Sequence, residues 1–151
     1  MAVLTRIELT EIMVNPDPSD PHGWSAGSQL EALRYYTDPK AVTILATHMD
    51  SDYQGDCYAV LVVRHRRKVR YVLWRDSFGS CSGCDSLEGQ NGYAYVKDTL
   101  QEGNTRQFRS IVDLREYVRT SEDYSWSVGR EKIEAMLEKG AGDDRRDPRG
   151  G

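Results

Sequence analysis

Cys81 and Cys84 form a C-x-x-C pair within a segment of small residues that runs from 76 to 89. Glycine and serine leave the backbone free to curl, so N–H groups and sulfur atoms of this segment can converge on one point. C-x-x-C spacing can place two thiolates on one metal ion, or can form a redox disulfide when the first thiol stands at a helix N-terminus. The alternative, which we favour, is that both cysteines close a tight turn and pack against Trp74 and Phe78.

A zinc site needs four ligands, and the C-x-x-C pair supplies two of them. Cys57 is the candidate third ligand and His48 the candidate fourth. Three carboxylates are alternatives to the histidine: Asp50, Asp76 and Asp85. The chain has three cysteines and no second C-x-x-C or H-x-x-x-H pair, which weakens the metal assignment. We therefore expect no cofactor, with zinc binding or thiol redox chemistry at Cys57, Cys81 and Cys84 as the alternative.

The same segment can also be interpreted as a phosphate-binding loop. This loop consists of Gly79, Ser80, Cys81, Ser82 and Gly83. A backbone of this kind before a helix start can cradle an anion with its N–H groups. No G-K-[ST] follows, so the loop is not a Walker motif, and Asp85 and Glu88 add negative charge at the same end. A nucleotide or another phosphorylated small molecule is the second alternative ligand.

Carboxylates gather around a histidine after the predicted strand 41–47. They are His48, Asp50, Asp52 and Asp56. Oxygen ligands of this kind can hold a hard cation, but calcium-loop spacing requires a third acid that residues 50–55 lack. We interpret the segment as a solvated turn with Asx-type hydrogen bonds.

A cluster of positive charge occupies the turn between two apolar runs. Its members are Arg64, Arg66, Arg67, Lys68 and Arg70. Five cations at one hairpin tip could contact phosphate or an acidic partner protein. The alternative is a solubilising tip that also blunts strand pairing, because runs of charge are usually solvated.

Charge and hydropathy narrow the class of the protein. The chain of 151 residues has a net charge of −4, so contact with nucleic acid is expected only through the local basic tip. No apolar run approaches the ~20 residues that span a bilayer, and residues 1–11 lack a signal-peptide core. We therefore predict a cytoplasmic protein without membrane contact. His22, His48 and His65 form no Ser-His-Asp pattern and no carboxylate pair stands out, which disfavours an enzyme.

The apolar periodicity predicts a single α+β domain over residues 1–139. We expect an antiparallel sheet of roughly three to five strands, with about three helices mainly on one face. Residues 140–151 contain no apolar side chain able to anchor them, so we expect a disordered tail there.

The individual elements follow from local patterns. Strands or extended segments are predicted over 3–14, 41–47, 57–63, 69–74 and 105–108. Helices are predicted to begin near Ser25 or Ser28, at Ser110, and near Ser127, with Gly140 ending the last one. Residues 93–96 are either a strand or the start of a helix through Leu100. A hairpin turn centred on Arg66 and Arg67 would place Cys57 opposite Arg75 or Asp76.

Two segments carry a resemblance to a known group of proteins. The first is Tyr58-x-Val60 with Arg70-Tyr71-Val72-Leu73-Trp74-x-Asp76-Ser77-x-Gly79-Ser80-Cys81-Ser82-Gly83-Cys84-Asp85-x-Leu87-Glu88. The second is Phe108-x-Ser110 followed by an amphipathic helix. On this pattern the middle and later parts of the chain resemble small uncharacterised accessory proteins of tailed bacteriophages. The resemblance implies the cytoplasm of a bacterial host cell as the setting, and implies no activity for single residues.

The sequence therefore predicts a non-enzymatic, phage-type accessory protein that binds a host or phage macromolecule, and a protein is the expected partner. The setting suggests inhibition of a host process such as antiviral defence. Oligomeric state is not indicated by any of these patterns.

Overall fold

The computed structural model describes residues 6–16, 29–50, 55–78, 92–101, 105–122 and 129–144 of the chain. The chain begins with η1 (Leu9–Ile12), α2 (Gln29–Tyr35), β1 (Val42–Met49) and β2 (Gly55–His65). It continues with β3 (Lys68–Phe78), α3 (Gly92–Thr99), β4 (Thr105–Phe108), α4 (Ile111–Thr120) and α6 (Arg130–Asp144). Strands and helices are thus combined in an α+β arrangement.

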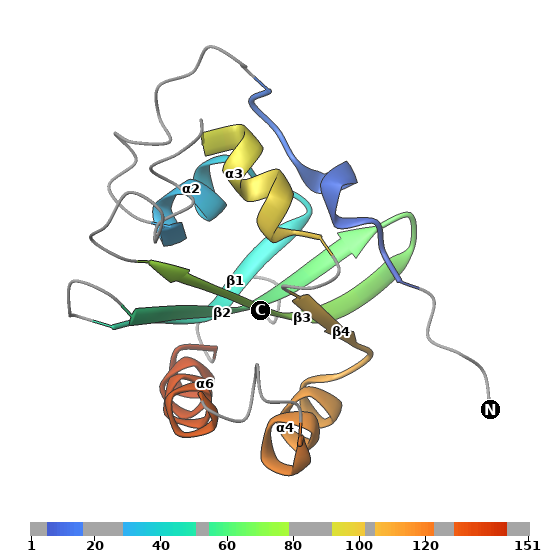
Figure 1. Ribbon diagram of the computed structural model, residues 1–151. Coiled ribbons are helices and arrows are strands. Elements are labelled where there is room, and N and C mark those ends of the chain that lie inside the picture. The colour runs from blue at the N-terminus through green and yellow to red at the C-terminus, as the bar shows by residue number, and fades with distance from the viewer. Residues whose placement is uncertain are drawn as a thin grey trace.

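The strands form one four-stranded sheet in the order β1-β2-β3-β4 (Figure 1). Each neighbouring pair is antiparallel. The predicted fold class, an antiparallel sheet with helices, is therefore confirmed. The predicted strands over 41–47, 57–63, 69–74 and 105–108 overlap the observed ones.

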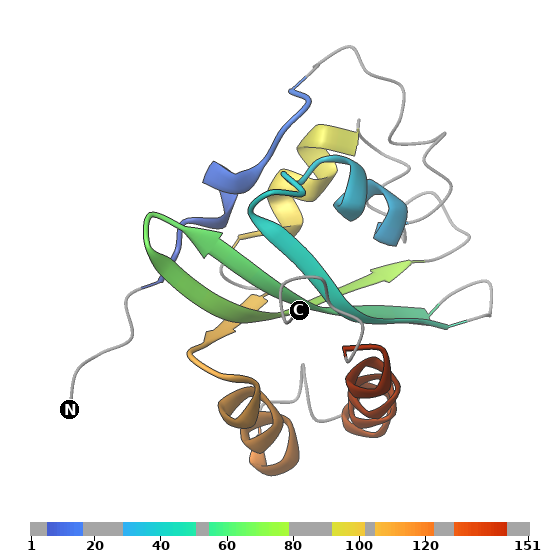
Figure 2. The ribbon, with the colours of Figure 1, turned by 180° about the vertical axis from the view of Figure 1, so that it is seen from behind.

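Strand β2 is buried on both faces, and this determines where the helices pack. Cys57, Ala59 and Leu61 face a core built with η1, α2 and α3, whereas Tyr58 and Val60 face a second core built with α4 and α6. Side chains alternate between the two faces of a strand, so an unbroken apolar run needs cover on both. Figure 2 shows this division from behind, with α4 and α6 on the face opposite α2 and α3. The sequence predicted helices mainly on one face. The structure instead divides them between both faces.

Strands β2 and β3 form the long central hairpin. Their register pairs Cys57 with Asp76 and His65 with Lys68, so the turn consists of Arg66 and Arg67. Both the predicted centre of the turn and the predicted place of Cys57 are confirmed. Periodicity and turn position together were enough to define this hairpin because its contacts are local in sequence.

The N-terminal segment differs from the prediction of a strand over 3–14. Residues 9–12 form the short 3-10 helix η1, and one isolated bridge joins Met13 to Thr37. Ile7, Leu9 and Ile12 are all buried in the same core. A strand would direct Leu9 and Ile12 to opposite faces, whereas the tight turn of η1 directs both inward, into the core that also holds Ile7.

One predicted helix start, at Ser110, is confirmed. The Ser110 hydroxyl accepts a hydrogen bond from the N–H of Asp113 and begins α4. Residues 93–96, predicted as either a strand or the start of a helix, lie in helix α3. Ser25, Ser28 and Ser127, the other predicted starts, lie outside the described residues.

Helix α6 does not end at Gly140 as predicted but continues to Asp144. A glycine inside a helix costs only about 1 kcal/mol relative to alanine, so it weakens the helix without ending it. Residues 140–144 of the predicted tail are therefore helical, and residues 145–151 lie outside the described part of the chain.

A buried glutamine fastens the N-terminal segment to the sheet. The amide of Gln107 accepts a hydrogen bond from the N–H of Ile7 and donates one to its carbonyl, both at 2.8 Å. Ile7 and Gln107 are 3% and 8% exposed, so water cannot replace these bonds. The pair holds residues 6–8 beside β4.

We expect Gln107→Leu to lower the free energy of unfolding by about 1–3 kcal/mol, because it leaves two buried backbone groups of Ile7 without partners. Denaturant unfolding followed by circular dichroism measures the change. Gln101→Leu is the matched control. Gln101 is exposed, so this substitution should change the free energy of unfolding by no more than about 0.5 kcal/mol. Equal losses in the two variants would show that the Ile7 contact does not matter.

Candidate functional site

The predicted partner-binding residues lie together at one end of the sheet. We call Arg64, Arg66, Arg67, Lys68 and Arg70 the basic tip. Arg66 and Arg67 form a two-residue turn with φ values of 50° and 68°. Two positive φ values in a two-residue hairpin loop define a type I′ turn, which favours Asn-Gly. An L-residue other than glycine in this region costs roughly 1–2 kcal/mol, so this turn is strained at both positions.

One acidic side chain contacts the basic tip within the described ranges. Glu11, from η1, accepts from His65 Nε2 at 2.8 Å and lies 3.6 Å from the Arg66 guanidinium. The Arg66 side chain is nevertheless 74% exposed, and Arg67 is exposed as well. Exposed ion pairs are weak, so Glu11 orients the tip without neutralising it.

A second polar cluster lies at the opposite end of the central hairpin, on the face covered by α6. We call it the Asp50 cluster; its members are His48, Asp50, Asp56, Tyr58, Arg75 and Lys132. Asp50 Oδ1 lies 2.8 Å from His48 Nε2, and Oδ2 lies 2.8 Å from Lys132 Nζ. Oδ2 also accepts the N–H of Asp56 at 2.9 Å. The carboxylate therefore links the end of β1 to the start of β2 and to α6.

The environment of Asp50 favours its charged form. Burial alone would raise the pKa of its carboxyl group, but hydrogen bonds from Asp56, Lys132 and His48 outweigh burial and hold the pKa well below its ordinary value of 3.8. The hydrogen bond to Asp50 in turn raises the pKa of the Lys132 ammonium group. A carboxylate with so low a pKa is a weak base, and three donors already occupy it. The arrangement suits a structural clasp better than proton transfer.

Tyr58 packs at the centre of the same cluster. Burial raises the pKa of its hydroxyl, the Asp56 carboxylate adds to the rise, and the Arg75 guanidinium partly opposes it. The hydroxyl is buried and makes no hydrogen bond of good geometry with the described residues. A Cβ at Gly129 would lie 2.0 Å from the Tyr58 hydroxyl oxygen, so glycine is needed where the chain enters α6. The cluster is thus tightly packed around Tyr58.

The predicted metal ligands are only partly described. Cys57 is fully buried, and its thiol donates to the carbonyl of Asp76 at 3.5 Å. His48 pairs with Tyr58 in the register and lies on the other face of the sheet from Cys57, so these two side chains are not brought together. Within the described ranges, no group of three or more His, Cys, Asp or Glu side chains could hold a metal ion.

Several predicted ligands lie outside the described residues. They are Gly79, Ser80, Cys81, Ser82, Gly83, Cys84, Asp85 and, in the β1–β2 loop, Asp52. The phosphate-loop and zinc interpretations of this segment therefore stay predictions. Asp76, another candidate ligand, accepts a hydrogen bond from the hydroxyl of Tyr95.

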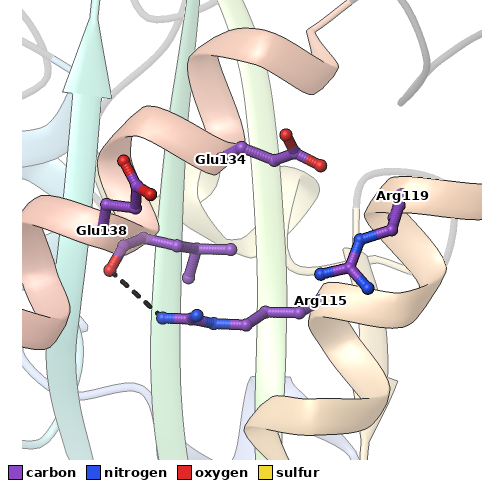
Figure 3. Close-up of a pocket in the computed structure, with 5 residues that line it drawn as sticks. Arg115, Arg119, Glu134 and Glu138 are labelled. Atoms are coloured by element: carbon purple, nitrogen blue, oxygen red, sulfur yellow. Dashed lines mark hydrogen bonds between the residues drawn. The ribbon is translucent and has the colours of Figure 1, made fainter.

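A small pocket lies between α4 and α6 (Figure 3). It has a volume of about 130 Å³ and is lined by Arg115, Arg119, Glu134, Leu137 and Glu138. Arg115 donates to the carbonyl of Leu137 at 3.5 Å, and Arg119 lies 3.5 Å from the Glu116 carboxylate. Both arginines thus serve contacts within the protein, and the two glutamates disfavour an anion. Of these contacts, the one from Arg115 joins the two helices.

Local sequence patterns did not indicate Glu11, His65 or Lys132 as members of these sites. Glu11 contacts His65 across 54 positions, and Lys132 contacts Asp50 across 82. Neither pair has a spacing that a motif could reveal, because packing of η1 and α6 on opposite faces creates both contacts.

We expect Asp50→Asn to lower the free energy of unfolding by about 1–3 kcal/mol at neutral pH, because the charge-assisted hydrogen bonds are weakened. A carboxyl with a depressed pKa contributes stability that is present above its unfolded pKa, near 3.8, and is lost as pH falls through the folded value. The difference between wild type and variant should therefore shrink as the pH falls below that point. Urea unfolding at a series of pH values measures it.

Asp98→Asn, in an exposed position of α3, is the control and should change stability by no more than about 0.5 kcal/mol. A deficit for Asp50→Asn that stays constant from neutral to strongly acidic pH would contradict the role assigned to the carboxylate charge.

Comparisons with family models, curated proteins and solved structures find no match to this chain. In the described part of the chain, no helix is both long and apolar enough to cross a membrane.

Proposed function

We propose that this protein binds an acidic surface of a partner protein through the basic tip. The observation that carries the proposal is the turn itself, in which Arg66 and Arg67 both have left-handed backbone conformations. Asn-Gly would form the same turn without strain. Strained residues of this kind gather at binding and catalytic sites, where the side chain is needed in spite of its backbone cost.

Solubility alone does not account for this arrangement. The ends of β2 and β3 already carry Arg64, Lys68 and Arg70, which are partly exposed and keep the hairpin hydrated. Arginines at the two strained positions expose both side chains at the end of the hairpin. A guanidinium forms two parallel hydrogen bonds with a carboxylate, which suits recognition of Asp or Glu side chains.

The overall charge favours a protein partner over nucleic acid. The net charge is −4, so most of the surface repels a polyanion and only the tip attracts one. A long nucleic acid would extend beyond the tip, whereas an acidic patch on a protein can match its size. The resemblance to phage accessory proteins supports a setting in which the partner is a host or phage protein, and in which binding inhibits a host process.

We expect the double variant Arg66→Asn with Arg67→Gly to raise the free energy of unfolding by about 1–2 kcal/mol, because Asn-Gly relieves the strain of the turn. The same variant should lose affinity for the partner by about tenfold or more, because two charges at the tip are removed. Affinity capture from a bacterial lysate, treated with nuclease and compared between wild type and variant, identifies the partner. Titration of that partner then measures the loss.

Arg109→Ala with Arg119→Ala removes two exposed arginines from the α4 region and is the control for loss of charge. The control should retain the partner. Equal retention by the Asn-Gly variant would show that the basic tip is only a solubilising turn. Capture that disappears after nuclease treatment would identify nucleic acid as the partner and contradict the proposal.

A further inference from the structure

Strand β1 leaves its outer edge unpaired by any other described strand. It is the first strand in the sheet order and pairs on one side only, with β2. Its sequence, VTILATHM, contains no Lys, Arg, Asp, Glu or Pro. Proteins usually protect such edges with charge, proline or a bulge. Here the protection within β1 is a bulge between Ile44 and Ala46.

The backbone groups that point outward can be located from the ends of the strand. The N–H of Asp50 donates to Asp56, and the carbonyl of Ala41 accepts from Arg64, so both residues direct these groups to β2 or its continuation. Backbone groups alternate between the two sides of an antiparallel strand. Alternation from Ala41 places the backbone N–H and C=O of Ile44 on the outer edge. Alternation back from Asp50 places those of Met49 and Thr47 on the same edge. The outward groups therefore belong to an even position before the bulge and to odd positions after it. The extra residue at the bulge, Leu45, causes this change.

The outward edge borders a groove between the two helical layers. This groove has a volume of about 290 Å³ and is lined by Arg34, Ile44, Leu45, Ala46, Thr47, Met136 and Lys139. Arg34 comes from α2 on one face of the sheet, and Lys139 comes from α6 on the other (Figure 2). Each is exposed, and neither makes an ion pair or hydrogen bond with another described residue. The groove thus offers the backbone hydrogen-bonding groups of the β1 edge between two cations.

We propose that an extended acidic peptide segment of a partner protein binds along β1 and adds a fifth strand to the sheet. Addition of a strand takes its affinity from backbone hydrogen bonds and its specificity from side chains beside the edge. Both charged residues of the groove are cations, so a segment with Asp or Glu at alternating positions fits it. The proposal concerns β1 rather than the basic tip, and it stands whether or not the tip binds a partner.

A second copy of the chain fits this edge less well. Antiparallel pairing of two β1 strands about a two-fold axis normal to the sheet keeps each face on its own side. Arg34 would then approach the Arg34 of the other copy, and the two Lys139 side chains would approach each other. Like charges brought together oppose such pairing, whereas an acidic strand neutralises them.

The test uses the full chain and two fluorescent probe peptides of equal length, one of alternating Glu and Val and one of alternating Lys and Val. We expect fluorescence anisotropy to show binding of the Glu-Val peptide and none of the Lys-Val peptide. Thr47→Pro removes an outward N–H without touching the ladder to β2, and should weaken binding by about tenfold or more. Thr47→Val keeps that N–H and should bind as wild type does.

Two further measurements locate the peptide. Hydrogen exchange followed by NMR should show slower exchange at the amides of Ile44, Thr47 and Met49 when the Glu-Val peptide is bound. Arg34→Glu with Lys139→Glu should weaken binding by about fivefold or more, while the same reversal at Arg109 and Arg119 should not. If Thr47→Pro fails to fold, the comparison of these two charge reversals tests the proposal in its place.

Several results would overturn the proposal. Equal binding of the Glu-Val and Lys-Val peptides would show that the two cations do not select the peptide. Unchanged hydrogen exchange at the amides of Ile44, Thr47 and Met49 would show that the peptide does not bind along β1. No binding of either peptide at the highest soluble concentration would also refute it. A dimer in sedimentation experiments that Thr47→Pro abolishes would make a second copy the occupant.

Discussion

The burial of β2 on both faces is the constraint from which the rest of this architecture follows. An apolar strand in the middle of an antiparallel sheet cannot leave either face to water, so each face must be covered. The chain meets this need with η1, α2 and α3 on one side and with α4 and α6 on the other. The two cores share only the sheet. Within the described ranges, the basic tip and the Asp50 cluster therefore lie at the two ends of the hairpin, away from the centres of both cores.

The two ends of the central hairpin have opposite characters. At one end, the carboxylate of Asp50 is held by three donors and fastens α6 to the sheet. Its charge is thus satisfied by contacts within the protein. At the other end, Arg66 and Arg67 keep strained backbone conformations and exposed side chains. Charge that is exposed at a conformational cost is available for a partner, whereas charge that is buried and paired stabilises the fold.

The two edges of the sheet differ in the same way. Beside β4, the buried amide of Gln107 binds the backbone of Ile7, so the N-terminal segment protects that side. Along β1, no described segment plays this part, and the charged side chains that line the groove are Arg34 and Lys139. An edge that is apolar, open and flanked by cations is disposed toward an acidic strand and away from self-association. The molecule therefore presents two cationic features, the basic tip and the β1 groove.

Local patterns in the sequence were sufficient for the hairpin and for α4. The apolar run from Cys57 to Val63 and the turn at Arg66 and Arg67 define a register that depends on neighbours in the chain. Ser110 marks a helix start for the same reason. Alternation in residues 3–14 was misleading, because Leu9 and Ile12 lie in a tight turn that buries both in the core of Ile7.

The sequence by itself thus determined the main secondary-structure elements and the basic character of the hairpin tip. The tertiary structure decided which face each helix covers, since burial of β2 demands two layers without saying which helix supplies each. It also decided the contacts of Asp50 with Lys132 and of Glu11 with His65, which join residues 82 and 54 positions apart. Contacts at such separations depend on the packing of whole elements, and no local spacing records them. The groove of Arg34 and Lys139 exists for the same reason, because two helices on opposite faces meet at one strand edge only after the sheet has formed.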